Sequence, residues 1–174
     1  MLGGALVGCL AGSAAAQEGL GLAHSRPFSA FSASASSVRD SVVAVARAQI
    51  GRRYRMGGTT PEGGFDCSGL VRYVLAALQV ELPRTAAQQA AIGSAVARDT
   101  TRLRPGDLLT FGRGSRVSHV GIYVGEGRYV HASVKAGRVI ETSLSRPRSP
   151  LVRIWRGARR VVAADSSSAE VPRG

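Results

Sequence analysis

The chain has 174 residues, which suffices for one ordinary domain with tails, and 44% of them are hydrophobic, too many for a wholly disordered chain. Aromatic residues make up only 5%, so the core must be built mainly from Ala, Val, Leu and Gly. The 23 basic and 11 acidic residues give a formal net charge of +12, which favours a polyanionic partner: nucleic acid, an anionic membrane surface or an acidic polymer. Arginines on solvent-exposed faces would give the same charge, so charge alone does not choose a partner.

Residues 1–16 have the pattern of a secretory signal peptide. A short apolar stretch from Leu2 to Leu10 is followed by small residues up to Ala16, before Gln17. The stretch is too short to span a bilayer as a helix. Residues 6–9, Leu-Val-Gly-Cys, also resemble a bacterial lipoprotein processing site, at which Cys9 would become the lipidated first residue. We expect export, against the alternative of a plain apolar segment, and the lipidation of Cys9 stays open.

Export would leave Cys67 as the only thiol of the mature chain, because Cys9 is either removed or lipidated. An intrachain disulfide is then excluded, although the compartment is oxidising. A lone cysteine of this kind is either buried and inert or kept for chemistry.

The first half of the chain has helical patterns. Residues 17–37 are rich in Ser, Ala and Gly without periodicity, which predicts a flexible linker. Order is expected from Val38, in a helix with Ser37 as N-cap and Gly51 as stop. After a Gly-rich loop at 51–65, a second helix should begin near Cys67, with one face formed by Leu70, Val71, Val74, Leu75 and Leu78. Thr85 and Gln88 have capping-box spacing, which predicts a short third helix up to Gly93.

The second half of the chain has strand patterns instead. A short apolar run at 108–111 follows a turn, and residues 118–124 and 128–134 predict two strands of a hairpin. Residues 139–143 and 152–156 are further strand candidates. Helices followed by strands indicate an α+β domain with an antiparallel sheet, which we place at 38–160, before a disordered tail at 161–174.

Cys67 is the candidate nucleophile. Backbone N–H groups at a helix N-terminus stabilise an anion, so we expect a lowered pKa for this thiol. The same groups could bind the oxyanion formed when a carbonyl is attacked. A small, buried, inert cysteine is the alternative, but Asp66 beside it and the Gly-rich loop before it argue against a purely apolar setting.

A thiol nucleophile needs a base with an orienting partner, and the chain has three histidines. His24 lies in the expected linker, whereas His119 and His131 lie on the two strands of the expected hairpin. A three-residue loop at 125–127 would pair Val124 with Arg128 and would place His131 opposite Gly121. Both imidazoles would then lie on one face as diagonal neighbours, while a two-residue loop would separate them. No metal site is expected, because a fourth ligand and the usual ligand spacing are missing.

Five stretches together resemble the NlpC family of papain-like cell-wall peptidases over about residues 40–157. These stretches are GRRYRMGG, FDCSGLVRYV, LPRTAAQQ, PGDLLTF and SHVGIYVGEGRYVHAS. The resemblance implies a papain-like NlpC fold, with N-terminal helices packed on a central antiparallel sheet. One departure is LLTF, where the family more often has an aromatic pair, and we expect Thr110 to be tolerated there.

The resemblance also implies roles for individual residues. Cys67 is similar to the family's nucleophile, His119 to its base, and His131 to the polar residue that orients the base. The other matched positions are substrate-binding residues: Tyr54, which closes the site, Asp66 and Ser68, which line the groove, and Arg84, which lies with Gln88 in a recurrent motif. The resemblance implies no cofactor.

The function expected from the resemblance is hydrolysis of peptide bonds in the stem peptides or crosslinks of peptidoglycan. Carboxylates on D-Glu and diaminopimelate suit a basic protein. The alternatives are a Cys–His amidase or acyltransferase of the same fold, a wall-binding module without catalysis, and a nucleic-acid-binding protein, for which no recognition motif is present. The single-domain layout resembles that of small Gram-negative murein endopeptidases. We therefore expect a periplasmic protein, or one attached to the outer membrane through a lipidated Cys9, rather than a secreted protein.

Overall fold

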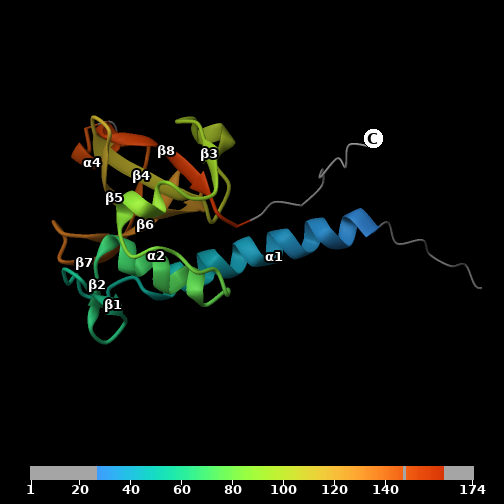
Figure 1. Ribbon diagram of the computed structural model, residues 1–174, viewed down its shortest axis with the longest axis horizontal. Helices are drawn as coiled ribbons and strands as arrows, with labels where there is room; N and C mark the ends of the chain where they lie inside the picture. The colour runs from blue at the N-terminus through green and yellow to red at the C-terminus, as the bar shows by residue number, and fades with distance from the viewer. Residues whose placement is uncertain (1–26, 147, 163–174) are drawn as a thin grey trace, which may run out of the picture.

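The computed structural model describes residues 27–146 and 148–162, so the expected signal peptide, Cys9 and the tail beyond residue 162 lie outside the described residues. The domain contains two packed layers, with α1 and α2 on one face of a sheet (Figure 1). The elements follow the chain as α1(Pro27–Ala48), β1(Thr59–Thr60), β2(Gly64–Phe65), α2(Cys67–Ala76), α3(Ala86–Gln89), β3(Ser94–Val96), η1(Thr100–Arg102), β4(Leu108–Arg113), β5(Arg116–Gly125), β6(Arg128–Ser133), β7(Arg138–Ser143), α4(Pro150–Arg153) and β8(Trp155–Arg160). No helix in these residues is long and apolar enough to cross a bilayer.

Helix α1 begins at Pro27, so the flexible linker predicted up to residue 37 is wrong from residue 27 onward. The absence of periodicity suggested a linker, but no Gly or Pro interrupts the chain between Pro27 and Ala48. Proline suits the first turn of a helix, and alanine is the best helix former. The N-terminal half of α1 extends beyond the body of the domain, whereas Val42 and Ala46 are fully buried (Figure 1).

Helix α2 begins at Cys67, as predicted, because Asp66 caps it and accepts a hydrogen bond from the Gly69 N–H. One face buries four aliphatic side chains completely: Leu70, Val71, Val74 and Leu75. Each contributes about 1.5–3 kcal/mol through burial. The predicted capping box of Thr85 and Gln88 is also present, although α3 ends at Gln89 before the predicted stop.

The main sheet has six strands in the order β3-β8-β4-β5-β6-β7, all antiparallel, and β1 and β2 form a separate two-stranded sheet. The α+β class and the four strands predicted between residues 108 and 143 are confirmed. The strand predicted at 152–156 is wrong at its start. Pro150 stands in the first turn of α4, and the strand begins only at Trp155.

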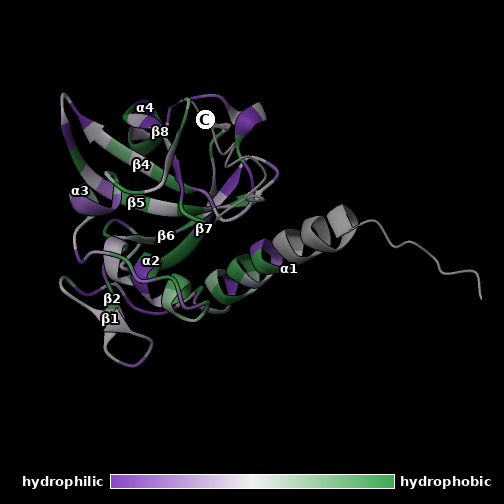
Figure 2. Ribbon diagram, turned by 45° about the vertical axis from the view of Figure 1, so that its right-hand side comes forward, coloured by the Kyte–Doolittle hydropathy of each residue, from purple (hydrophilic) through white to green (hydrophobic). Residues whose placement is uncertain are grey.

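The sheet has a hydrophobic core on each face, and Figure 2 shows hydrophobic residues along β4 and β5 between them. One core joins α1 and α2 to the sheet, and the other joins α4 to the opposite face. Val162 is buried in the first core, so the tail predicted from residue 161 begins too early.

Candidate active site

Cys67 lies at the start of α2, where the helix meets the sheet. Its side chain is partly exposed and contacts the core that includes Val120. The backbone of Val120 hydrogen-bonds to its sulfur, as do the backbone N–H groups of Ser68 and of Cys67 itself. Val120 follows His119 in β5, so the candidate nucleophile and base come from adjoining points of helix and strand.

His119 and His131 lie side by side on one face of the sheet. His119 Nε2 is 2.9 Å from His131 Nδ1, and the two rings meet edge to face with centroids 5.0 Å apart. The predicted shared face is therefore present. Gly121 leaves the space expected of it, since a Cβ there would lie 3.2 Å from the Cβ of His131.

The hairpin reaches this register by a different route from the one predicted. Gly125 pairs with Arg128, which leaves a two-residue loop, so the predicted pairing of Val124 with Arg128 is wrong. A register shift between Tyr123 and Gly125 inserts one extra residue, and Tyr123 still faces Tyr129. A β-bulge thus restores the parity that a two-residue loop alone would have reversed.

His131 is the more enclosed of the two imidazoles, with only 5% of its surface exposed. The Tyr129 ring packs against it at a centroid distance of 5.1 Å, and Phe111 packs against His119 at 5.8 Å. Burial raises the pKa of Tyr129 to about 12, and its hydroxyl has no hydrogen-bond partner among the described residues. Aromatic packing on both sides thus fixes the orientation of the pair.

Both imidazoles are uncharged at neutral pH. Burial lowers the pKa of His119 to about 4. Burial, with a further contribution from the charge of His119, lowers the pKa of His131 to about 3. The single hydrogen bond between them needs one donor and one acceptor, which two neutral rings supply.

The Cys67 thiol is less acidic than the sequence analysis predicted. Burial raises the pKa of Cys67, and the negative charge of Asp66 raises it further. The backbone hydrogen bonds of Val120, Ser68 and Cys67 act in the opposite direction but do not offset burial. The expected lowered pKa is therefore wrong, because burial and the charge of Asp66 outweigh the backbone hydrogen bonds.

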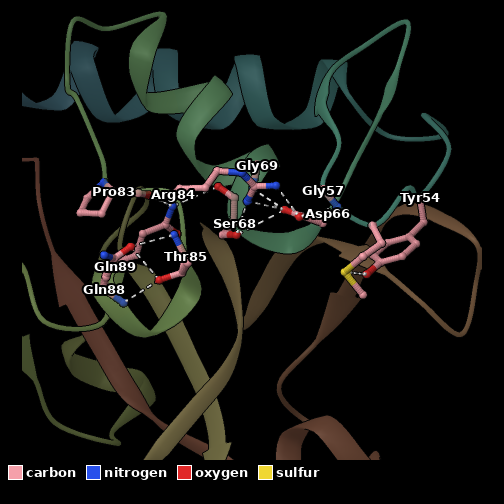
Figure 3. A network of polar contacts seen from close by, with 11 residues as sticks. Tyr54, Gly57, Asp66, Ser68, Gly69, Pro83, Arg84, Thr85, Gln88 and Gln89 are labelled. Atoms are coloured by element: carbon pink, nitrogen blue, oxygen red, sulfur yellow. Dashed lines mark hydrogen bonds and ion pairs between the residues drawn. The ribbon is translucent and has the colours of Figure 1, made fainter.

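Asp66, Ser68 and Arg84 form one polar network at the start of α2 (Figure 3). The Arg84 guanidinium donates to both carboxylate oxygens of Asp66, at 3.1 and 2.6 Å, and to the Ser68 hydroxyl at 2.9 Å. Burial alone would raise the pKa of Asp66, but the hydrogen bonds from Arg84, Gly69 and Gly57 lower it overall. Asp66 and Ser68 are 7% and 5% exposed, so Arg84 is the most accessible member of the network.

Tyr54 lies on the other side of Asp66 from Arg84 (Figure 3), and a bridge joins its backbone to that of Phe65. Burial raises the pKa of its phenol, and the nearby charges of Cys67 and Asp66 raise it further. The phenol therefore stays protonated at neutral pH, and its hydroxyl lies 3.7 Å from the Met56 sulfur.

Gln89, rather than its neighbour Gln88, connects α3 to the candidate site. Gln88 caps α3 and is exposed, whereas Gln89 is fully buried and donates to the carbonyls of Ser68 and Pro83. Gln89 thereby links the segment that carries Arg84 to the start of α2, a role that sequence reasoning missed. Thr110 fits its buried place by donating to the Gly157 carbonyl at 3.1 Å.

A cleft of about 1110 Å³ opens beside the imidazole pair. His119, His131 and Tyr129 line it together with residues from the end of β6, from β7 and from α4. Sequence reasoning missed this cleft, because its walls come from segments that are far apart in the chain. No group of three His, Cys, Asp or Glu side chains that could hold a metal ion occurs within residues 27–146 and 148–162.

Comparison with protein families shows a match to the model described as NlpC/P60 family over residues 51–156. The range includes every candidate site residue named above. It also includes strands β1 to β7 and the first two residues of β8.

Several characterised proteins are similar in sequence. Gamma-DL-glutamyl hydrolase of Bacillus subtilis is 38% identical over 80% of this chain and 34% of its own length. Murein DD-endopeptidase MepH of Escherichia coli is 43% identical over 66% of this chain and 42% of its own length. The chain thus spans less than half of the length of these two relatives.

Solved structures agree with the sequence comparison. The peptidoglycan hydrolase RipB from Mycobacterium tuberculosis matches with a TM-score of 0.64 and 30% identity, over 76% of this chain and 68% of that one. An NlpC/P60 family protein from Bacillus cereus matches with a TM-score of 0.65 and 30% identity, over 72% and 40% of the two chains.

Proposed function

Because this chain belongs to the NlpC/P60 family, we propose that it is a cysteine endopeptidase that hydrolyses peptide bonds in the stem peptides or crosslinks of bacterial peptidoglycan. One observation carries the proposal. A partly exposed thiol at a helix start lies against the strand of His119, whose Nε2 is 2.9 Å from His131. Relatives whose names include glutamyl hydrolase and murein endopeptidase support the same substrate class.

The contact between the imidazoles supports Nδ1 of His119 as the nitrogen that acts as base. His119 Nε2 is engaged with His131, so Nδ1 is the ring nitrogen left to accept the thiol proton. In its neutral form His119 then carries its proton on Nε2 and donates to His131 Nδ1. His131 fixes this tautomer and the orientation of the His119 ring.

The reaction starts from two neutral partners. The raised pKa of Cys67 keeps the thiol protonated, and the lowered pKa of His119 keeps Nδ1 free to accept a proton. As the sulfur attacks the scissile carbonyl carbon, its proton passes to Nδ1, and an acyl-enzyme forms when that proton goes on to the leaving amine. A water molecule activated by the same nitrogen then releases the acyl group and restores the thiol.

The oxyanion of each tetrahedral intermediate needs hydrogen-bond donors close to the sulfur. The N–H groups at the start of α2, including that of Cys67, stand where the sulfur already receives backbone hydrogen bonds. Such preorganised donors commonly contribute about 3–4 kcal/mol each to transition-state stabilisation.

Substrate binding on the acyl side is assigned to Tyr54 and to the network of Asp66, Ser68 and Arg84. Arg84 has 36% of its side chain exposed and can offer a guanidinium N–H to a substrate oxygen. Asp66 holds that guanidinium in place, and the protonated Tyr54 hydroxyl provides a further donor near Cys67.

The substrate places the protein outside the cytoplasm, in the periplasm or on the outer membrane through a lipidated Cys9. Its partner is the peptidoglycan itself. Analysis of the mature N-terminus in cell extracts should find Gln17, a nearby residue or a modified Cys9. An intact Met1 would contradict export.

The activity is tested by incubating the full chain with purified peptidoglycan and with isolated muropeptide dimers, and identifying the products by mass. We expect cleavage at the D-Ala–diaminopimelate crosslink or at the D-Glu–diaminopimelate bond. The Cys67→Ala variant should release no fragments while still binding the wall, because the cleft is unchanged. A Cys67→Ala variant that releases fragments, or a wild-type chain that binds without cleaving, would refute the proposal.

A further inference from the structure

The cleft beside the imidazole pair has a strongly cationic rim. Four basic residues line it from three separate segments: Arg113 at the end of β4, Lys135 after β6, and Arg146 and Arg148 between β7 and α4. All four are exposed, and none forms an ion pair within the described part of the chain. No Asp or Glu of that part lines the cleft.

The strand geometry explains why no acid neutralises this rim. Ile140 and Thr142 line the cleft, and Glu141 between them points to the other face of β7. There its carboxylate binds Arg47 and Arg128. On the acyl side, Asp66 pairs with Arg84 in the same way. The positive charge that lines the cleft beside the catalytic histidines is therefore not neutralised by any ion pair within the described part of the chain.

The cleft also has apolar walls. Tyr129, Ile140, Leu151 and Ile154 line it, together with Val134, which is 67% exposed. An aliphatic chain that carries carboxylates fits a site with apolar walls and a cationic rim, because each part of it meets its complement.

The mechanism decides which half of the substrate can lie there. His119 returns its proton to the leaving amine, so the leaving half must lie beside His119, which is one of the residues that line the cleft. In both candidate bonds, D-Ala–diaminopimelate and D-Glu–diaminopimelate, the leaving amine belongs to diaminopimelate. That residue is an aliphatic diamino acid with two carboxyl groups.

We infer that this cleft binds the diaminopimelate of the leaving half, with Arg113, Lys135, Arg146 and Arg148 selecting its free carboxylate. The inference rests on the proposed function and adds a specificity site to it. Charge-assisted hydrogen bonds of this kind give about 10- to 100-fold discrimination between a carboxylate and a neutral group.

The test compares two muropeptide dimers that differ only in the free carboxyl of the leaving diaminopimelate, which is a carboxylate in one and an amide in the other. The enzymes are the full wild-type chain, Arg146→Gln/Arg148→Gln and Arg113→Gln/Lys135→Gln. Arg72→Gln/Arg104→Gln is the matched control, since it removes the same charge at exposed residues that do not line the cleft.

Wild type and control should cleave the carboxylate dimer about 10- to 100-fold better in kcat/KM than the amide dimer. The cleft variants should lose most of this preference, mainly through a higher KM, and should cleave the amide dimer as wild type does. Equal cleavage of both dimers by wild type, or a preference retained in both cleft variants, would overturn the inference while leaving the peptidase intact. A wild-type chain that cleaves neither dimer would overturn the proposed function and this inference with it.

Discussion

Replacing Asp66 by Asn would separate the structural role of this carboxylate from its effect on Cys67. Asn is as good an N-cap as Asp, so the hydrogen bond from the Gly69 N–H survives. The amide nitrogen that replaces Oδ2, however, can accept neither the Gly57 N–H nor the Arg84 guanidinium N–H, and the charge attraction to Arg84 is lost. Stability and thiol chemistry should therefore change for different reasons.

The loss of stability follows from the exposure of the partners. Removing one partner of a fully buried ion pair costs about 3–5 kcal/mol, and an exposed pair is worth less than about 1 kcal/mol. Asp66 is 10% and Arg84 36% exposed in their side chains, so water replaces part of what is lost. We expect about 1–2 kcal/mol, or a melting temperature lower by about 2–8 °C for a chain of this size.

The thiol should respond in the opposite sense, by becoming more acidic. The charge of Asp66 raises the pKa of Cys67, and its removal leaves Arg84 as an unpaired cation that favours the thiolate. The pH midpoint of Cys67 alkylation should therefore move down in Asp66→Asn. The alkylation rate at pH 7, measured by mass spectrometry, should rise even as the protein becomes less stable.

Asp99→Asn is the matched control for this experiment. Asp99 also caps a helical turn, through the Thr101 N–H, but its side chain is 43% exposed. Its substitution should change the melting temperature by less than about 2 °C and leave alkylation unchanged. An Asp66→Asn protein that melts with wild type, or one whose Cys67 alkylates more slowly, would refute the reasoning.

Three further predictions concern the imidazole pair. His119→Ala should lower kcat by about 10²–10⁴-fold and His131→Gln by less, and combining His119→Ala with Cys67→Ala should add little, because the residues act as one unit. Between pH 6.5 and about 4 the free energy of unfolding should fall with falling pH, by up to about 1.4 kcal/mol per pH unit for each imidazole, because the unfolded chain binds protons that the buried rings do not. Denaturant titrations at several pH values should show that this free energy depends less steeply on pH in His131→Gln than in wild type. Gly121→Ala would place a Cβ 3.1 Å from the Tyr129 ring and 3.2 Å from the His131 Cβ. Turnover should therefore fall, and the free energy of unfolding should drop by about 1–3 kcal/mol. A fully active variant as stable as wild type would contradict the argument that residue 121 must be small.

The local sequence determined the elements that carry the site. The apolar helical repeat after residue 66 predicts a helix start near Cys67, and the Thr85–Gln88 spacing predicts a capped turn, because both signals depend only on neighbouring residues. Strand alternation determined which residues share a face within each strand, His119 with Gly121 and Tyr129 with His131, but not how the two strands pair. The linker at 27–37 was predicted wrongly, since Ser- and Ala-rich sequence without apolar periodicity is compatible with helix as well as coil.

Tertiary structure decided the features that depend on distant partners. The bulge at Tyr123–Gly125 restored a register that loop length alone would have reversed, and no local signal specified it. The raised pKa of Cys67 arises first from burial in the folded domain and then from the negative charge of Asp66, and a position at a helix start does not reveal that burial. The cationic cleft likewise exists only after β4, β6 and the segment before α4 have met. Burial and long-range charge are properties of the packed chain. The sequence therefore predicted the candidate site residues, but not the pKa of Cys67 or the cleft beside the imidazole pair.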